Sequence, residues 1–293
     1  MKHAVLVMAH GSLSVLKNCM EILDDQKFDF YVHIDKKSHE SGEYLLDVCE
    51  ISNVFLTERI PVFWGHWSQT KAAMILLKSA LDSTTPYDYY HLISSVDMPL
   101  KTPDEINHFF EENKGTEFVR YWTVKGKNPY NRRMTYRYPF LTWYRRNKYE
   151  IVNNMQKLVY TRILRFPRKK NNIVTDQKWQ VEAGDLWWSI SDKLARALAD
   201  REQEMMPYWE DCYVSDETYV QTQLKHMPEL SKKQSNFQTR EIDWSRGKPY
   251  IWRMDDVDEL LASKAMFARK FDPTNKALLD FLRDTIMERK IRQ

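Results

Sequence analysis

The first third of the chain alternates short apolar runs with segments whose apolar residues recur at helical spacing. Apolar spacing of about 3.6 residues predicts helices over residues 13–23 and 67–81. A third helix is expected after Thr102, which is followed by proline and, three positions on, by glutamate. Four runs have the length of a buried strand, namely residues 3–10, 28–34, 54–56 and 87–93. This alternation predicts an α/β fold with a Rossmann-like, mostly parallel central sheet.

The second half of the chain is less regular. We expect a strand over Gln180–Ile190, a helix beginning at Ser191 and another helix capped by Ser215. A boundary near residue 116 fits the change in pattern. No linker rich in Gly, Ser or Pro marks it, so the two halves are expected to pack as one domain over residues 1–293.

Charge is distributed unevenly along the 293 residues. The formal net charge is +3, yet residues 118–170 carry fifteen Lys or Arg and a single acid, Glu150, so the rest of the chain is acidic. Many aromatic residues lie within this basic segment. The mixture suits a phosphate-bearing partner or an anionic membrane surface, and it suits equally well a solvated, charge-rich face.

Several classes of protein are excluded or disfavoured by what the sequence lacks. No run of eighteen apolar residues occurs, so no membrane-spanning helix is expected. The start of the chain does not resemble a secretory signal, and three widely spaced cysteines indicate free thiols in a reducing compartment. We therefore expect a cytoplasmic protein.

The sequence also lacks the usual loop and ligand patterns for phosphates and metals. With seven glycines it has no glycine-rich phosphate loop, so a nucleotide phosphate would have to be held by side chains. No His or Cys spacing indicates zinc, and the Asp256-Val257-Asp258 triplet is more typical of a helix surface than of a metal site. We expect no metal site.

Polar residues at strand ends and in one predicted helix are candidates for chemistry. His10, Asp35 and Asp97 follow predicted strands, and ligands of open α/β sheets bind beyond the carboxyl ends of strands. Glu217 lies in the first turn of the helix expected after Ser215, where an acid also interacts favourably with the helix dipole. Taken singly, these residues do not decide a function.

Taken in order, eight segments resemble the family of core-2/I-branching N-acetylglucosaminyltransferases and peptide O-xylosyltransferases, in a bacterial-type form without the cysteines of secreted animal members. The resemblance spans nearly the whole chain. Its segments are Val5–His10, Tyr31–Ser38, Trp64–Ser68, Tyr87–Lys101, Gly184–Ile190, Ser215–Glu217, Arg240–Trp244 and Met266–Asp272.

The resemblance implies a GT-A-like fold and an inverting transfer from a UDP-sugar without a divalent metal. Glu217 is similar to the family's general base, supported by Asp216. Arg240 and Lys270 are similar to the two cations that bind the donor diphosphate in place of a metal. The half over 1–116 would bind the nucleotide, and the half over 117–293 would bind the acceptor and carry out catalysis.

The remaining expected contacts also follow from the resemblance. The residues expected to bind the nucleotide are His10, Asp35, Lys37, Trp64 and Gly65. Asp97, Trp187 and Trp188 are expected in the donor and acceptor pocket, although paired tryptophans are also typical of a core.

The expected partners are a UDP-sugar, with N-acetylglucosamine first and xylose second, and a glycan acceptor used in surface polysaccharide synthesis. A lipid-linked acceptor would place the protein at the inner membrane face through residues 118–170. One alternative is a non-catalytic glycan-binding module on the same fold. Another is a nucleic-acid-binding protein using the basic segment, which the acidic remainder of the chain argues against.

Overall fold

The computed structural model describes residues 1–122, 128–143, 149–176 and 179–292, and a five-stranded sheet runs through its centre. The sheet order is β3-β2-β1-β4-β8, with the first four strands parallel and β8 antiparallel to β4. The bounds are β1 His3–Ala9, β2 Phe28–Ile34, β3 Val54–Leu56, β4 Tyr89–Ser94 and β8 Ser189–Ser191. The predicted α/β fold with a mostly parallel sheet is confirmed.

The strands are apolar along their whole length because both faces of the sheet are covered. Every residue of β1, β2 and β4 is buried. Side chains of successive residues point to opposite faces, so Val5 and Val7 belong to one core and Leu6 to the other. Such continuous apolar runs are what parallel strands between two helical layers require.

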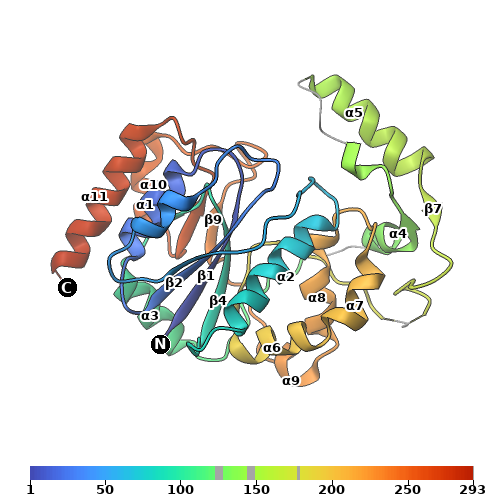
Figure 1. Cartoon of the computed structure of the whole chain (residues 1–293), viewed down its shortest axis with the longest axis horizontal. Helices are drawn as coiled ribbons and strands as arrows, with labels where there is room; N and C mark the ends of the chain where they lie inside the picture. The colour runs from blue at the N-terminus through green and yellow to red at the C-terminus, as the bar shows by residue number, and fades with distance from the viewer. Residues whose placement is uncertain (123–127, 144–148, 177–178, 293) are drawn as a thin grey trace.

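Helices form a layer on each face of the sheet (Figure 1). One layer packs on the core that contains Val5 and consists of α1 Ser14–Leu23, α3 Pro103–Glu112, α10 Val257–Ala262 and α11 Lys276–Arg292. The other packs on the core that contains Leu6 and consists of α2 Ser68–Leu81, α6 Asp192–Asp200, α7 Glu202–Trp209, α8 Tyr219–Lys225 and α9 Pro228–Ser231. The helices predicted over residues 13–23 and 67–81, after Thr102 and from Ser191 are all present. Thr102 forms a capping box with Glu105.

A small second sheet pairs the segment that follows β4 with two strands from late in the chain, within residues 240–269. Its order is β5-β10-β9, with β10 antiparallel to β5 and parallel to β9. The bounds are β5 Met98–Pro99, β9 Arg240–Ile242 and β10 Phe267–Arg269. The second half of the chain therefore contributes β8 to the central sheet and two strands beside the end of β4. Single turns of helix complete the body, at η1 Glu43–Asp47, η4 Ser215–Glu217 and η5 Met254–Asp256.

An arm projects from the body on the side of α7 and α8 (Figure 1). We define the arm as the described residues of 129–170. Its elements are α4 Pro129–Thr135, β6 Tyr136–Arg137, η2 Leu141–Trp143, α5 Glu150–Leu158, the π-helical turn η3 Val159–Ile163 and β7 Phe166–Pro167. Strands β6 and β7 pair with each other and connect α5 to the body.

Two predictions for the second half are wrong. Of the predicted strand Gln180–Ile190 only its last two residues pair in the sheet, because the backbone before them bonds to the neighbourhood of α8 instead: Glu182 N donates to Thr222 Oγ1 at 3.1 Å. Ser215 begins a 3-10 turn and caps no helix; its hydroxyl lies 2.9 Å from that of Thr70. The α-helix starts only at Tyr219.

Candidate active site

The carboxyl ends of β1, β2 and β4 form one edge of the central sheet. Asp35 N donates to Ala9 O at 2.9 Å, and Ser95 N donates to Met8 O at 3.1 Å. Three strands thus end side by side, and His10 and Asp35 leave them at the same level. This is the edge at which ligands bind in open α/β sheets.

The Asp35 carboxylate is held by its own loop and by Lys37. Oδ1 accepts from the backbone N–H groups of Lys37 and Val62, and Oδ2 lies 2.6 Å from Lys37 Nζ. The Lys37 ammonium also lies 4.4 Å from the centre of the Phe63 ring. The structure therefore brings Asp35 and Lys37 together, as the sequence predicts.

His10 and Lys270 lie in the same electrostatic neighbourhood as this pair. Burial is the main cause that lowers the pKa of His10, and the Lys270 cation is the next. Asp35 acts in the opposite direction. Lys270 follows β10, and Phe271 N donates to Val96 O at 3.0 Å, which fixes the end of β10 against the end of β4.

Arg269 is a residue of this site that the sequence predictions missed. Its guanidinium stacks 4.2 Å from the centre of the Trp187 ring, and Nε lies 3.7 Å from Asp97 Oδ1. The side chain is only 13% exposed, and Nε and Nη1 have no hydrogen-bond partner within the described chain. Burial lowers the pKa of Arg269. A buried cation with unpaired N–H groups is suited to receive an anion.

Asp97 lies next to Arg269 and has no exposed surface. It is fully buried, and its carboxylate accepts from the backbone N–H and the hydroxyl of Ser94. It caps no helix, since Thr102 performs that role for α3. The prediction that Asp97 lies in the donor pocket is therefore wrong. Its buried carboxylate instead faces the Arg269 guanidinium.

Arg240 does not face this site. Its side chain is buried, and its four terminal N–H groups donate to Ser189 Oγ, Thr239 Oγ1, Leu92 O and Trp188 O. Burial lowers the pKa of Arg240 to about 9. This geometry contradicts the predicted contact with a diphosphate, because the guanidinium instead ties β4, β8 and β9 together.

The two tryptophans have different places. Trp188 is buried in the core on the α2 side of the sheet, so its predicted place in the pocket is wrong. Trp187 is partly exposed and lies under Arg269. Only Trp187 can contact a ligand.

The turn that carries Glu217 is fixed by its neighbours on both sides. Val214, just before it, has a φ of 55°, which is strained for a β-branched residue, and its N–H donates to Gly65 O at 2.7 Å. Gly184 N donates to Glu217 O at 2.8 Å. Backbone strain held in place by surrounding bonds is a common feature of functional sites.

The Glu217 carboxylate is partly buried and paired. Oε2 lies 2.8 Å from Nη1 of Arg133 in α4, and 26% of the Glu217 side chain is exposed. Burial raises the pKa of Glu217, and the Arg133 cation opposes that rise. The nearby Asp185 carboxylate also raises it. The sequence offered no signal that separates Arg133 from the other cations of the basic segment.

Asp216 is buried beside Glu217. Its Oδ1 has no hydrogen-bond partner within the described residues. Burial, and secondarily the Glu217 carboxylate, raises the pKa of Asp216 to about 7. The two acids therefore have different environments: the partly exposed Glu217 is paired to a cation, whereas burial raises the pKa of Asp216 to about 7.

Trp64 and Gly65 lie against the turn of Glu217 as well as near Asp35. Gly65 has a φ of 70°, and a Cβ there would lie 3.0 Å from Cε2 of Tyr213. The exposed Trp64 ring makes an edge contact with Tyr213 at 6.4 Å between ring centres. Since Val62 and Phe63 contact Asp35 and Lys37, this loop connects the predicted nucleotide site to the turn of Glu217.

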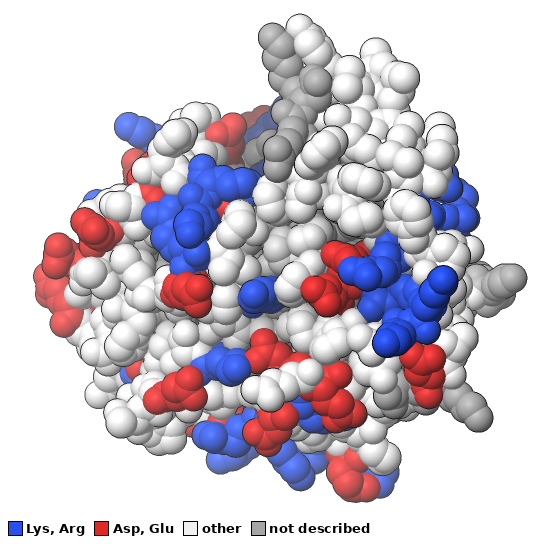
Figure 2. Space-filling view, turned by 45° about the vertical axis from the view of Figure 1, so that its right-hand side comes forward, with Lys and Arg blue, Asp and Glu red and all other residues white. Residues whose placement is uncertain are grey.

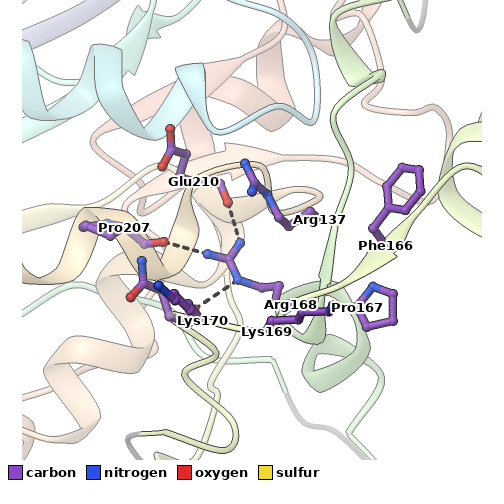
Figure 3. A pocket seen from close by; sticks show the side chains of 9 residues that line it. Arg137, Phe166, Pro167, Arg168, Lys169, Lys170, Pro207 and Glu210 are labelled. Atoms are coloured by element: carbon purple, nitrogen blue, oxygen red, sulfur yellow. Dashed lines mark hydrogen bonds between the residues drawn. The ribbon is translucent and has the colours of Figure 1, made fainter.

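A separate cavity of about 480 Å³ lies at the base of the arm and contains none of the predicted site residues (Figure 3). It is lined by Arg137, Phe166, Pro167, Arg168, Lys169, Lys170, Asn171, Pro207 and Glu210. Arg168 is buried there and donates to the backbone oxygens of Asn171, Pro207 and Glu210. Arg168 therefore holds the base of the arm to the body.

Figure 2 shows Lys and Arg side chains in several separate groups on this face, with Asp and Glu side chains among them. Within residues 1–122, 128–143, 149–176 and 179–292, no group of three His, Cys, Asp or Glu could hold a metal ion. In the same residues, no helix is long and apolar enough to cross a membrane.

Comparison with known proteins gives relatives of two kinds. Human beta-1,3-galactosyl-O-glycosyl-glycoprotein beta-1,6-N-acetylglucosaminyltransferase is 23% identical over 305 residues, which cover 92% of this chain and 65% of the human protein. Xylosyltransferase 1 of Pan troglodytes is 26% identical over 121 residues, which cover 40% of this chain and 13% of that protein. The chain thus spans less than two thirds of these relatives' length.

Among solved structures, apo mouse xyloside xylosyltransferase 1 matches with a TM-score of 0.37 and 10% identity, covering 91% of this chain and 96% of the mouse chain. TarS 1-349 of S. aureus matches with a TM-score of 0.31 and 16% identity, covering 44% of this chain and 38% of that one. The sequence model of the family described as "Branch: Core-2/I-Branching enzyme" matches residues 4–259. Because that match covers most of its length, the chain belongs to the core-2/I-branching enzyme family.

Proposed function

We propose that the chain is a glycosyltransferase that moves a sugar from a UDP-sugar to a glycan hydroxyl, with inversion and without a metal. The observation that carries the proposal is that the short segment Gly184–Trp188 contacts both the turn of Glu217 and the side chain of Arg269. Gly184 bonds to the backbone of Glu217, and Trp187 lies under Arg269, next to Lys270. A base and a phosphate-binding pair are what a sugar transfer needs on the two sides of an anomeric carbon.

Glu217 is the proposed general base. Its partial burial raises its pKa, and the Arg133 cation opposes that rise by favouring the charged carboxylate. As the acceptor oxygen attacks the anomeric carbon, its proton passes to Glu217. The carbon–oxygen bond to UDP breaks on the opposite face, which inverts the configuration.

Lys270 and Arg269 are the proposed cations for the leaving diphosphate, with Arg269 in the role that the sequence assigned to Arg240. Charge grows on the UDP oxygens as the bond breaks, so cations placed there stabilise the transition state more than the ground state. Arg269 Nη1 lacks a hydrogen-bond partner within the described chain, whereas Nε faces the Asp97 carboxylate at 3.7 Å, so Nη1 is the group proposed to donate to the diphosphate. His10, Asp35 and Lys37 are proposed to bind the nucleoside.

N-acetylglucosamine is the first proposed sugar and xylose the second, since the relatives are named for these transfers. The proposed acceptor is a glycan of a surface polysaccharide, carried on a lipid at the inner membrane face. The competing function is a glycan-binding module that keeps the fold without the chemistry.

The first test is thermal unfolding with UDP-N-acetylglucosamine, UDP-xylose, UDP-galactose and UDP-glucose in the presence of EDTA. Ligand at about a hundredfold above its Kd stabilises a fold by about 2.7 kcal/mol, which is readily measured. One donor is expected to raise the Tm of the wild type and of Lys264→Met, an exposed lysine before β10, but not of Lys270→Met. The proposal fails if no UDP-sugar shifts the Tm, or if a shift needs Mg²⁺ or Mn²⁺.

Inversion is tested on the product. Proton NMR of the new linkage, compared with the donor, distinguishes inverted from retained anomeric configuration. A retained configuration would contradict the role proposed for Glu217. Glycan binding without any UDP release would favour the binding module.

A further inference from the structure

Helix α5 in the arm has an exposed apolar stripe. Ile151, Met155 and Leu158 are spaced by four and three residues, so they lie on one face of the helix. Their exposed fractions are 76%, 64% and 60%. Asn153 and Gln156, on the other side of the helix, are less exposed than the stripe.

This orientation is the reverse of the usual one. A helix on a globular protein normally turns its apolar stripe to the core and its polar side to water. Here no residue of α5 is buried. Further exposed apolar side chains lie close to α5 in the chain, at Trp143, Tyr149, Ile163 and Phe166. Figure 1 shows that α5 stands away from both helical layers, and the exposed fractions of Ile151, Met155 and Leu158 show that the described residues leave most of the stripe uncovered.

Basic side chains accompany the stripe. Lys157, Arg162, Lys169 and Lys170 are exposed in and after α5, whereas Glu150 is the one acid among residues 149–170. Figure 2 shows a mostly uncoloured area beside the grey atoms at the top of the molecule, where the arm projects, with basic side chains on the flank below it. Apolar and cationic groups are therefore presented together.

We propose that α5 lies in the surface plane of an anionic lipid bilayer, with Ile151, Met155 and Leu158 among the acyl chains. Short amphipathic helices with an apolar face and flanking Lys and Arg bind membranes in this way. Each cation near an anionic surface adds to the attraction, and tryptophan and tyrosine favour the interface between lipid and water. The inference deepens the proposed function and rests on it in one respect: a lipid-linked acceptor would be met at this surface.

Charge favours a membrane over a second copy of the chain as the partner. Two copies meeting through the same face would bring their cations together, which costs free energy in an interface. An anionic bilayer instead neutralises them. The test must therefore distinguish membrane binding from self-association of the chain through the stripe.

The test is cosedimentation of the full chain with vesicles of phosphatidylglycerol mixed with phosphatidylcholine, and with vesicles of phosphatidylcholine alone. Binding is expected only to the anionic vesicles, and it should weaken as salt is raised, since charge attraction is screened over about 8 Å at physiological ionic strength. Ile151→Asp should reduce membrane affinity about tenfold or more, because the isoleucine side chain no longer enters the apolar region. The matched control is Ile291→Asp, because Ile291 is 82% exposed at the end of α11 and outside the arm.

A neutral triple variant, Ile151→Ser with Met155→Ser and Leu158→Ser, distinguishes the loss of the apolar stripe from the effect of added negative charge. It should also lose binding while keeping the wild-type Tm, because the three side chains contact little of the protein. Absence of binding to anionic vesicles at low salt would overturn the inference, as would equal binding by Ile151→Asp and Ile291→Asp. So would light scattering that shows a dimer dispersed by Ile151→Asp. The Tm shift with UDP-sugar, measured on the same samples, reports separately on the proposed function.

Discussion

Replacing the buried Asp216 by asparagine should stabilise the protein at alkaline pH. The wild-type carboxyl is buried, Oδ1 lacks a partner within the described residues, and its pKa is raised to about 7 from an ordinary value of 3.8. The native state therefore holds the proton more tightly than the unfolded state does. By linkage, stability is greatest below the unfolded pKa and falls as the pH rises from about 4 to about 7.

The magnitude follows from the difference between the two pKa values. A difference of about three corresponds to about 4 kcal/mol, since one pKa unit is worth about 1.4 kcal/mol. The asparagine side chain would remain neutral at every pH. The free energy of unfolding of Asp216→Asn, minus that of the wild type, should therefore be near zero at about pH 4 and approach about 4 kcal/mol at about pH 8.

Urea unfolding followed by circular dichroism at both pH values measures this difference. The control is Asp258→Asn, which removes an exposed carboxyl on α10 and should give no comparable gain. Equal effects of Asp216→Asn at the two pH values, or a loss of stability at about pH 8, would refute the reasoning. That result would mean that the Asp216 carboxylate is paired or hydrated in the native protein.

Three further predictions follow from the site. Arg133→Met removes the cation that lowers the pKa of Glu217, so the acid limb of the pH–rate profile should move to higher pH, and an unmoved limb would contradict the pairing. Arg240→Met should lower the free energy of unfolding by about 3–5 kcal/mol, measured in urea, because buried acceptors lose their donor; an unchanged stability with weaker UDP binding would restore its diphosphate role. Gly65→Ala should cost about 1–3 kcal/mol in the same assay, from the positive φ and the contact with Tyr213, and a neutral effect would mean that the loop can move away.

The first half of the chain could be predicted from its sequence because local and long-range requirements agree there. Parallel strands between two helical layers must be apolar along their length, and the runs 3–10 and 28–34 show this directly. The edge that holds His10 and Asp35 then follows from strand direction alone. The start of α3 at Thr102 could also be predicted, because a capping box is a purely local sequence pattern.

The second half depends on contacts that spacing does not reveal. Gln180–Trp188 has the composition of a strand, but the backbone of Glu182 and Gly184 bonds to Thr222 and Glu217, and only Trp188 at its end bonds to β4, through Leu92 N. The same difficulty applies to cations. Arg240 and Arg269 are both basic residues in β-strands of one sheet. Only the tertiary structure shows that both terminal nitrogens of Arg240 donate to protein oxygens and leave Nε alone without a partner, whereas Arg269 lacks a partner at both Nε and Nη1 among the described residues.

The most direct test of the proposed chemistry is the rate of UDP release from the donor that binds, with water as the slow acceptor and EDTA present, for the wild type and Glu217→Gln. The amide keeps the shape of the side chain but cannot accept a proton, so release should fall by about 10²–10⁴-fold while the donor-induced Tm shift stays. A Glu217→Gln variant that releases UDP at the wild-type rate would show that Glu217 is not the base.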